Sequence, residues 1–250
     1  MKKYLIIATL ICFFALPAYA FNPLVVCGGG VAAGCAASLF EDDFDRGDTG
    51  DVQTGGSWTS ETDTGALLAI VSNAMVFTLT AQTAANVGKN LGSAYTETWT
   101  QFTWAASAVD MGGNNTIQYV LYLNDNGNSS SIRVRLVTDA SGDLTKVGVF
   151  YFNDSAVQTQ IGADYAFNPV ATTVYTFKLR TKQSTDVDTS DGIVTLEIDD
   201  TPVITASDLD YFTYADIQYA QIGNIYTTWT DTAGNTETFN NFEIREDDCF

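Results

Sequence analysis

Three short stretches of the sequence decide the fold class: IRVRL at residues 132–136, YTFKLR at 175–180 and VTLEID at 194–199. In each stretch an apolar residue alternates with a polar or charged residue. Successive side chains of a β-strand point to opposite faces of the sheet, so a period of two is typical of a strand buried on one face. These stretches therefore predict three β-strands, each with one side in a core.

Segments of similar composition lie on both sides of these stretches. Further strands are expected at residues 67–71, 75–79, 98–106, 116–123, 146–152, 217–222 and 238–245. Clusters of Asn, Asp and Gly, which favour turns, lie between several strands at 124–128, 139–143 and 188–192. Many short strands at this spacing, with no convincing helical period, predict an all-β, two-sheet antiparallel sandwich.

The order of several short motifs resembles the jelly rolls of the laminin-G-like and concanavalin A-like lectin and glucanase family. The motifs are FEDDFDR at 40–46, GSW at 56–58, IVSNAM at 70–75, YTFKL at 175–179, VTLEIDDTPVI at 194–204 and FNNFEI at 239–244. The turn that usually reads Asp-Gly in the family is Asp199-Asp200 here. The resemblance implies a jelly roll in which the first and last strands pair, and fold alone does not imply function.

Residues 1–20 have the pattern of a cleaved secretory signal peptide. Two lysines precede an uncharged apolar run at residues 5–16, and Ala18-Tyr19-Ala20 is an A-x-A cleavage site. A helix needs roughly 20 apolar residues to span a bilayer, and this run is shorter. We expect a secreted, periplasmic or cell-surface protein without a membrane span. The alternative is a short buried helix at the N-terminus.

The rest of the chain divides by composition. Residues 21–38, rich in Gly and Ala, are expected to form a flexible leader, and residues 39–250 a single lectin-like domain. The formal net charge is −19. Such a field repels nucleic acid and anionic lipid, which are therefore excluded as partners, and a glycan or cell-surface polymer is expected instead.

The chain contains no histidine. This absence excludes nucleophilic systems that depend on His and the usual imidazole metal sites, and leaves carboxylates, Tyr or Lys for any catalysis. Glu197 and Asp199 alternate on one strand, as a glycosidase pair would. The residues that follow, Asp200-Thr201-Pro202, lack the further glutamate of hydrolases on this fold. We therefore expect binding rather than catalysis.

Oxygen ligands for calcium are present near the first strand. Asp42, Asp43 and Asp45 lie there, and the terminal strand would bring Asn241 or its neighbour close. Carboxylate and amide oxygens suit calcium, and related jelly rolls often hold a structural calcium ion near their paired termini. A second acidic loop lies at residues 186–191. Acidic loops without an ion are the alternative.

Three cysteines, Cys27, Cys35 and Cys249, follow the predicted signal peptide. Cys35 precedes the first predicted strand and Cys249 follows the last, so antiparallel pairing of these strands favours a Cys35–Cys249 disulfide. A local Cys27–Cys35 bond is the alternative. The odd thiol, Cys27 in the favoured pairing, suggests self-association between chains.

Basic and aromatic residues are the candidate ligand-binding groups. The basic set is Arg133, Arg135, Lys178, Arg180 and Lys182. We expect these side chains to project away from the core and to share one outward surface with Gln118 and Tyr122, where a sugar, including an acidic one, could bind. An alternative stacking platform consists of the loop aromatics Trp58, Tyr211, Phe212, Tyr214, Tyr226 and Trp229.

The sequence therefore predicts a secreted, non-catalytic module that binds carbohydrate or a surface and includes a structural calcium ion. One alternative is a structural or adhesive protein that assembles through contacts between chains. The other is a carboxylate-dependent glycoside hydrolase or lyase on the same fold.

Overall fold

The structure is a computed structural model that describes residues 35–79, 84–113, 115–125, 130–229 and 234–250. The predicted signal peptide and most of the predicted leader lie outside these ranges. The described residues contain no helix long and apolar enough to cross a membrane.

The chain divides into two compact units. The first is Ser38–Asp248 with Phe250, and it contains all the strands given below. The second is Met1–Ala37 with Cys249, of which the structure describes residues 35–37 and Cys249.

A disulfide joins Cys35 to Cys249, whose Cα atoms are 5.8 Å apart. This is the pairing favoured above over Cys27–Cys35, and Cys27 itself lies outside the described residues. The bond spans 214 residues of sequence. A disulfide that closes a long loop stabilises the folded state by about 2–5 kcal/mol, mainly because it restricts the unfolded chain.

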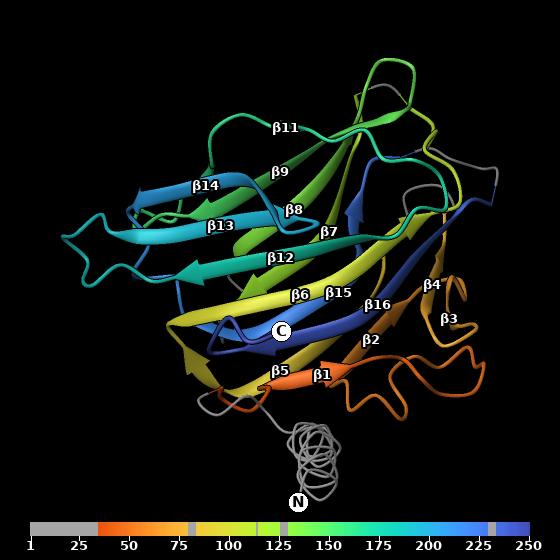
Figure 1. Cartoon of the computed structure of the whole chain (residues 1–250), viewed down its shortest axis with the longest axis horizontal. Coiled ribbons are helices and arrows are strands. Elements are labelled where there is room, and N and C mark those ends of the chain that lie inside the picture. Colours follow the sequence, from red (N-terminus) through yellow and green to blue (C-terminus); the bar gives the residue numbers. More distant parts are fainter. Residues whose placement is uncertain (1–34, 80–83, 114, 126–129, 230–233) are drawn as a thin grey trace, which may run out of the picture. The chain divides into compact units, whose positions relative to one another are not determined.

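The first unit is built from two antiparallel sheets (Figure 1). Sheet A consists of β1 (Phe40–Asp42), β3 (Leu68–Ile70), β4 (Met75–Thr78), β6 (Glu97–Ala106), β12 (Tyr175–Lys182), β13 (Gly192–Ile198), β14 (Thr201–Leu209) and β16 (Thr236–Arg245). Its strand order is β14-β13-β12-β6-β16-β4-β3, and β1 also pairs with β16. The first and last strands are therefore neighbours.

The second sheet is formed mainly by the middle of the chain. Sheet B consists of β2 (Ser60–Asp63), β5 (Ala85–Tyr95), β7 (Ile117–Asn124), β8 (Ser130–Thr138), β9 (Leu144–Phe152), β10 (Gln158–Gln160), β11 (Tyr165–Ala166) and β15 (Ile217–Thr227). Its order is β10-β9-β8-β7-β15-β5-β2, and β11 pairs with β9. Figure 1 shows sheet A in front of sheet B.

The period of two in the sequence is visible in the burial of the side chains. Every second residue is buried along β6 and β13. The buried sides of both sheets meet in one apolar core, in which the rings of Phe102 and Phe177 stack with centroids 5.2 Å apart. The predicted two-sheet antiparallel sandwich is confirmed.

The strand that the sequence analysis missed most clearly is β5. Its sequence, ANVGKNLGSAY, contains Gly and Asn, which are depleted in strands. It forms because β15 and β2 supply hydrogen-bonding partners on its two sides. Pairing with distant segments overrides the local preference of such a stretch.

One carboxyl group lies inside the sandwich. Glu237 on β16 is fully buried and accepts hydrogen bonds from Trp104 Nε1 at 2.9 Å and Gln118 Nε2 at 2.5 Å. Because Gln118 lies on β7, this bond links the two sheets. Burial raises the pKa of Glu237 to about 7, although both hydrogen bonds act in the opposite direction.

The inward position of Gln118 corrects a prediction. The sequence analysis placed Gln118 on the outer face with Tyr122, but its side chain is fully buried against Glu237. A register shift between β7 and β8 separates Tyr119 from Leu121. Such a β-bulge changes which side chains point outward, and strict alternation cannot predict it.

We expect the free energy of unfolding to fall as pH rises from about 4.5 through about 7, because folded Glu237 retains a proton that unfolded Glu237 releases. The loss should approach about 3 kcal/mol. Urea denaturation at about pH 5 and about pH 8 measures it. Glu237→Gln should remove most of this difference, and an equal pH dependence in both proteins would contradict the assignment.

Candidate functional site

The basic residues predicted to share one surface lie on two. Arg133 and Arg135 belong to β8 of sheet B, whereas Lys178, Arg180 and Lys182 belong to β12 of sheet A. On both strands the basic residues alternate with buried ones, so they point to the outer faces of different sheets. The prediction of a single basic surface is wrong, because sheet membership separates the two groups.

The outer face of sheet A has a hollow of about 300 Å³. It is lined by Trp99, Lys178, Arg180, Thr195, Glu197 and Asp248. Both cations are already paired: Arg180 Nη2 lies 2.7 Å from Glu97 Oε1, and Lys178 Nζ lies 2.7 Å from Asp200 Oδ1. The Arg180 guanidinium also lies 5.1 Å from the Trp99 ring centroid and covers that ring. These contacts occupy the groups that a ligand would need.

The predicted catalytic pair is not assembled at this hollow. Glu197 lines it, but Asp199 belongs to the turn after β13, has a positive φ of 50°, and accepts a hydrogen bond from the Thr176 backbone N–H at 2.8 Å. The turn ends the alternation that would have placed both carboxylates on one face.

The outer face of sheet B aligns tyrosines with arginines on neighbouring strands. Tyr122 on β7 is opposite Arg133 on β8, and Tyr119 is opposite Arg135. On the other side of β7, Tyr226 of β15 is opposite Tyr119. Strand register therefore gathers side chains from the consecutive strands β7 and β8 and from β15, which is distant in sequence.

Arg133 lies among aromatic rings at the centre of this group. The guanidinium carbon is 4.8 Å from the ring centroid of Tyr122, 5.0 Å from that of Phe152 and 5.6 Å from that of Tyr119. Arg133 Nη1 donates a hydrogen bond to Gln158 Oε1 at 2.9 Å. Its Nε atom is buried without a hydrogen-bond partner.

Three tyrosines form the aromatic part of the face. The ring centroids of Tyr119 and Tyr122 are 5.4 Å apart, and those of Tyr119 and Tyr226 are 6.1 Å apart. Tyr226 is 50% exposed. Burial raises the pKa of Tyr122 to about 12 against the opposing effect of Arg133, so its hydroxyl group is neutral at physiological pH.

A row of polar side chains continues across β7, β15 and β5. Asn124 Nδ2 donates to Gln221 Oε1 at 3.2 Å, and Gln221 Nε2 donates to Asn86 Oδ1 at 3.3 Å. Tyr219 lies beside them over Gly88, where an added Cβ would be 1.9 Å from the Tyr219 hydroxyl oxygen. Gly88 is thus the residue that allows Tyr219 to lie across the sheet.

The second arginine of this face is neutralised. Arg135 Nη2 lies 2.9 Å from Asp164 Oδ2 and 3.0 Å from Asp164 Oδ1. Its guanidinium is 4.4 Å from the Phe150 ring centroid. An added Cβ on Gly148 would be 2.2 Å from Asp164 Oδ1, so glycine leaves room for the ion pair.

The tryptophans predicted as stacking platforms belong to the core. Trp58 and Trp229 are only 4% and 2% exposed, and Tyr211 is fully buried. Trp58 packs its ring 4.7 Å from that of Phe40. Of that aromatic set, Tyr226 is the member placed in the group around Arg133. The sequence could not separate these residues, because aromatics suit a core and a binding face equally well.

The Asp42 carboxylate is occupied by neighbouring groups. It accepts hydrogen bonds from the Phe44 backbone N–H at 2.8 Å, Arg46 Nη1 at 2.7 Å and Trp58 Nε1 at 2.6 Å. This arrangement fixes the loop after β1 and pairs the charge. Asp42 is therefore a structural anchor rather than a free ligand.

The other predicted calcium ligands are divided. Asp43 and Asn241 line a hollow of about 600 Å³ with Glu41 and Glu243, whereas Asp45 is not among its lining residues. Within the described ranges, no three carboxylates have oxygens close enough to share one ion. The donors are still hard oxygens, the chemistry that calcium requires. Calcium binding stays a prediction.

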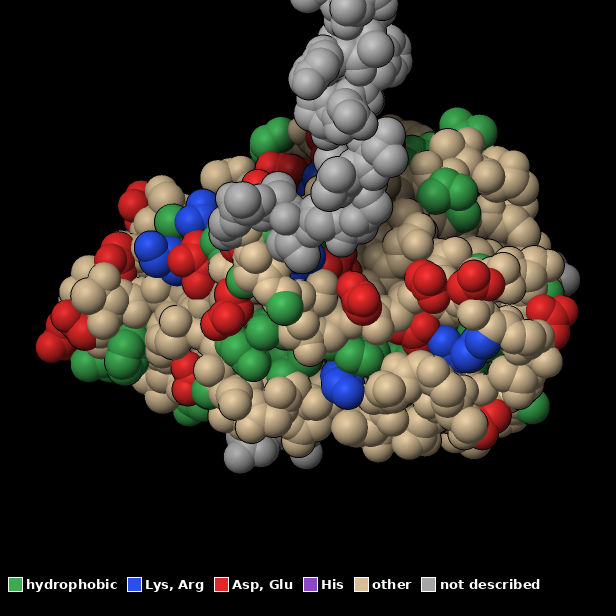
Figure 2. All heavy atoms as spheres, turned by 60° about the horizontal axis from the view of Figure 1, so that its bottom comes forward, with side chains coloured by type: hydrophobic (Ala, Val, Ile, Leu, Met, Phe, Trp, Pro, Cys, Tyr) green, Lys and Arg blue, Asp and Glu red, His purple; other side chains and the backbone are tan. Residues whose placement is uncertain are grey.

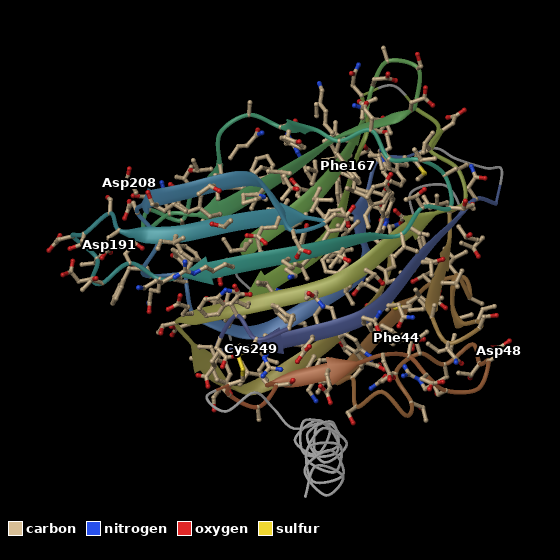
Figure 3. All side chains as sticks on the ribbon, viewed as in Figure 1. Phe44, Asp48, Phe167, Asp191, Asp208 and Cys249 are labelled. Carbon is tan, nitrogen blue, oxygen red and sulfur yellow. A yellow bond between two sulfur atoms is a disulfide. The ribbon has the colours of Figure 1, made fainter. Side chains whose placement is uncertain are left out.

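The second acidic loop lies far from the first. Figure 3 places Asp191 at the opposite end of the sandwich from Phe44, which lies between Asp43 and Asp45 in the sequence. Asp191 accepts hydrogen bonds from Thr185 of its own loop. In the view of Figure 2, basic side chains lie next to acidic ones rather than in a patch of one sign.

Neither a protein-family model nor a curated protein matches the sequence. Solved structures do match. The alginate lyase Aly36B is 12% identical, with a TM-score of 0.63 over 84% of this chain and 98% of that one. The endo-β-1,4-glucuronan lyase of the fungus Trichoderma reesei is 12% identical, with a TM-score of 0.56 over 84% and 96%.

A third similar structure is the binding domain of botulinum neurotoxin serotype G. It is 11% identical, with a TM-score of 0.53 over 85% of this chain and 49% of that one. At these identities the likeness shows the fold, which is a β-sandwich jelly roll. The more specific resemblance to laminin-G-like and concanavalin A-like domains stays a prediction.

Proposed function

We propose that this domain binds a polysaccharide across the outer face of sheet B, as an exported carbohydrate-binding module. The observation that carries the proposal is a tyrosine cluster beside Arg133: Tyr119 and Tyr122 contact the guanidinium, and the half-exposed Tyr226 packs against Tyr119. Sugar rings pack their C–H faces on aromatic rings, and their hydroxyl groups need nearby donors and acceptors. Gln221, the partly exposed member of the amide row, supplies such groups on the same sheet.

The contrast with sheet A favours sheet B. The hollow on sheet A is lined by cations that already pair with Glu97 and Asp200. On sheet B, Tyr226 is half-exposed, and the hydrogen bond of Arg133 within the described part of the chain is to a neutral amide. A ligand on sheet B therefore displaces fewer existing interactions.

The structural neighbours also support a carbohydrate ligand. Two of them are described as lyases of alginate and of glucuronan, and one Aly36B variant was solved in complex with an alginate trisaccharide. These ligands belong to those proteins. They support the class of ligand proposed for this chain.

Tyr122→Ala should weaken polysaccharide binding roughly tenfold or more, because each factor of ten corresponds to about 1.4 kcal/mol and a buried aromatic contact commonly contributes that much. Isothermal titration against a panel of neutral and acidic polysaccharides measures the effect. Phe250→Ala, which removes a 38% exposed aromatic residue near Lys178 on sheet A, is the matched control. Equal affinity of Tyr122→Ala and the native protein would contradict binding at the outer face of sheet B.

A polysaccharide lyase is the second candidate, and the position of Tyr122 favours it. The Tyr122 hydroxyl has no hydrogen-bond partner among the described residues, and its ring lies beside the Arg133 guanidinium. Elimination needs a base that removes a ring proton and an acid that protonates the leaving oxygen. The neutral Tyr122 hydroxyl suits the acid role, and an adjacent cation stabilises the negative charge that proton removal creates.

For a lyase, ultraviolet absorbance of an unsaturated sugar product should rise when the protein is mixed with a polysaccharide from the panel. Tyr122→Phe should abolish that signal while retaining most of the binding, because it removes only the hydroxyl group. Binding without any product in the native protein would leave the module non-catalytic.

Calcium remains part of the proposal as a structural ion at the hollow beside β1 and β16. Asp43, Asn241 and Glu41 line this hollow with oxygen donors. Calcium should raise the Tm relative to a chelator, since an ion that binds only the folded state stabilises it. Asp43→Asn should remove the shift, whereas Asp208→Asn, an exposed carboxylate on β14, should retain it. An unchanged Tm for the native protein would remove calcium from the proposal.

A further inference from the structure

Arg133 is an arginine that lacks a carboxylate partner. Among the described residues, no ion pair or acidic hydrogen-bond acceptor contacts its guanidinium. The other arginines of the chain all form ion pairs: Arg46 with Asp42, Arg135 with Asp164, Arg180 with Glu97, and Arg245 with Glu243. With 30 acidic and 11 basic residues in the chain, carboxylates are abundant, so an unpaired arginine is an exception to be explained.

We propose that Arg133 binds the carboxylate of an acidic sugar, so that the domain recognises uronate-bearing polysaccharides through this one guanidinium. The proposal rests on the function proposed above and names its ligand class.

The guanidinium is already held in place for such a contact. Nη1 is fixed by Gln158, and three aromatic rings surround the planar group. Little side-chain freedom is left to lose on binding, which favours affinity. Nη2 has no acceptor among the described residues, and Nε is buried without one. A carboxylate would satisfy the Nη2 donor that the described residues leave open, and a planar guanidinium recognises carboxylates well.

Arg135, two residues along the same strand, differs from Arg133 in its pairing. It is opposite Tyr119 on the same strand face, yet Asp164 holds it through both carboxylate oxygens. Both arginines thus lie against aromatic rings, but only Arg135 has a carboxylate partner. Of the two arginines on this face, Arg133 is therefore the one without a carboxylate partner.

The net charge of the chain determines how the affinity for an acidic polymer should depend on salt. A net charge of −19 repels an acidic polymer at long range, so attraction must come from the short contact at Arg133. Salt screens charges over about 10 Å at 0.1 M but weakens a partly buried contact much less. Affinity should therefore stay level or rise from about 0.01 M to about 0.15 M salt, whereas binding to a basic patch weakens.

The test is isothermal titration of the full chain with polygalacturonate, polymannuronate and polyglucuronate. Each polymer is compared with its methyl ester, which keeps the sugar and removes the charge. The native protein should bind at least one free polyuronate roughly tenfold to a hundredfold more tightly than the ester, the range of a charge-assisted hydrogen bond. A sulfated galactan in the same titration distinguishes a sulfate ligand from a carboxylate.

Arg133→Gln should remove the preference for the free acid, and Arg133→Lys should retain only part of it, because lysine keeps the charge but lacks the planar fork. Arg180→Gln is the matched control: it removes the same charge from an arginine that also lies over an aromatic ring, but on sheet A. It should leave the preference unchanged. Circular dichroism melting checks that each variant is folded, and the ester comparison needs no variant.

Three outcomes would overturn the inference without rejecting polysaccharide binding. They are equal affinity for polyuronate and ester, an unaltered preference in folded Arg133→Gln, and affinity that falls steeply with salt. Tighter binding of the sulfated galactan than of every polyuronate would overturn the carboxylate assignment. Binding of no polysaccharide, neutral or acidic, would instead reject the proposed function.

Discussion

The face-to-face packing of sheets A and B is the interaction on which the rest of this structure depends. Strands such as β6 and β13 commit every second side chain to the core, where Phe102 and Phe177 stack. The side chains between them point outward and do not pack in the core. The rows on the two outer faces exist only because the inner faces are occupied, so the chemistry of the surface is a consequence of the core.

A buried carboxyl group interrupts the apolar packing of the core. Glu237 on β16 is buried between Trp104 and Gln118, and its bond to Gln118 crosses from sheet A to sheet B. Burying a carboxyl group costs free energy unless its hydrogen bonds are made, and here both oxygens are bonded. The bond also holds β7 at the residue before Tyr119, so an interior contact helps to position the tyrosines on the outer face.

Charge pairing distinguishes the two outer faces. On sheet A, Lys178 and Arg180 pair with Asp200 and Glu97. On sheet B, Arg133 is surrounded by rings and bonded to a neutral amide. In a strongly acidic chain, the location of an unpaired cation is more informative about a ligand than the number of cations.

The sequence by itself determined the fold class and the ten strands predicted from alternation and composition, because both are local properties of the chain. It also indicated that Arg133 and Arg180 point outward from their strands. Only the tertiary structure decided that these arginines belong to different sheets, that Gln118, Trp58 and Trp229 are buried, and that the Gly-rich β5 is a strand. Sheet membership, bulges and ion-pair partners such as Asp164 depend on pairing between residues far apart in the chain, and no local pattern records those pairings.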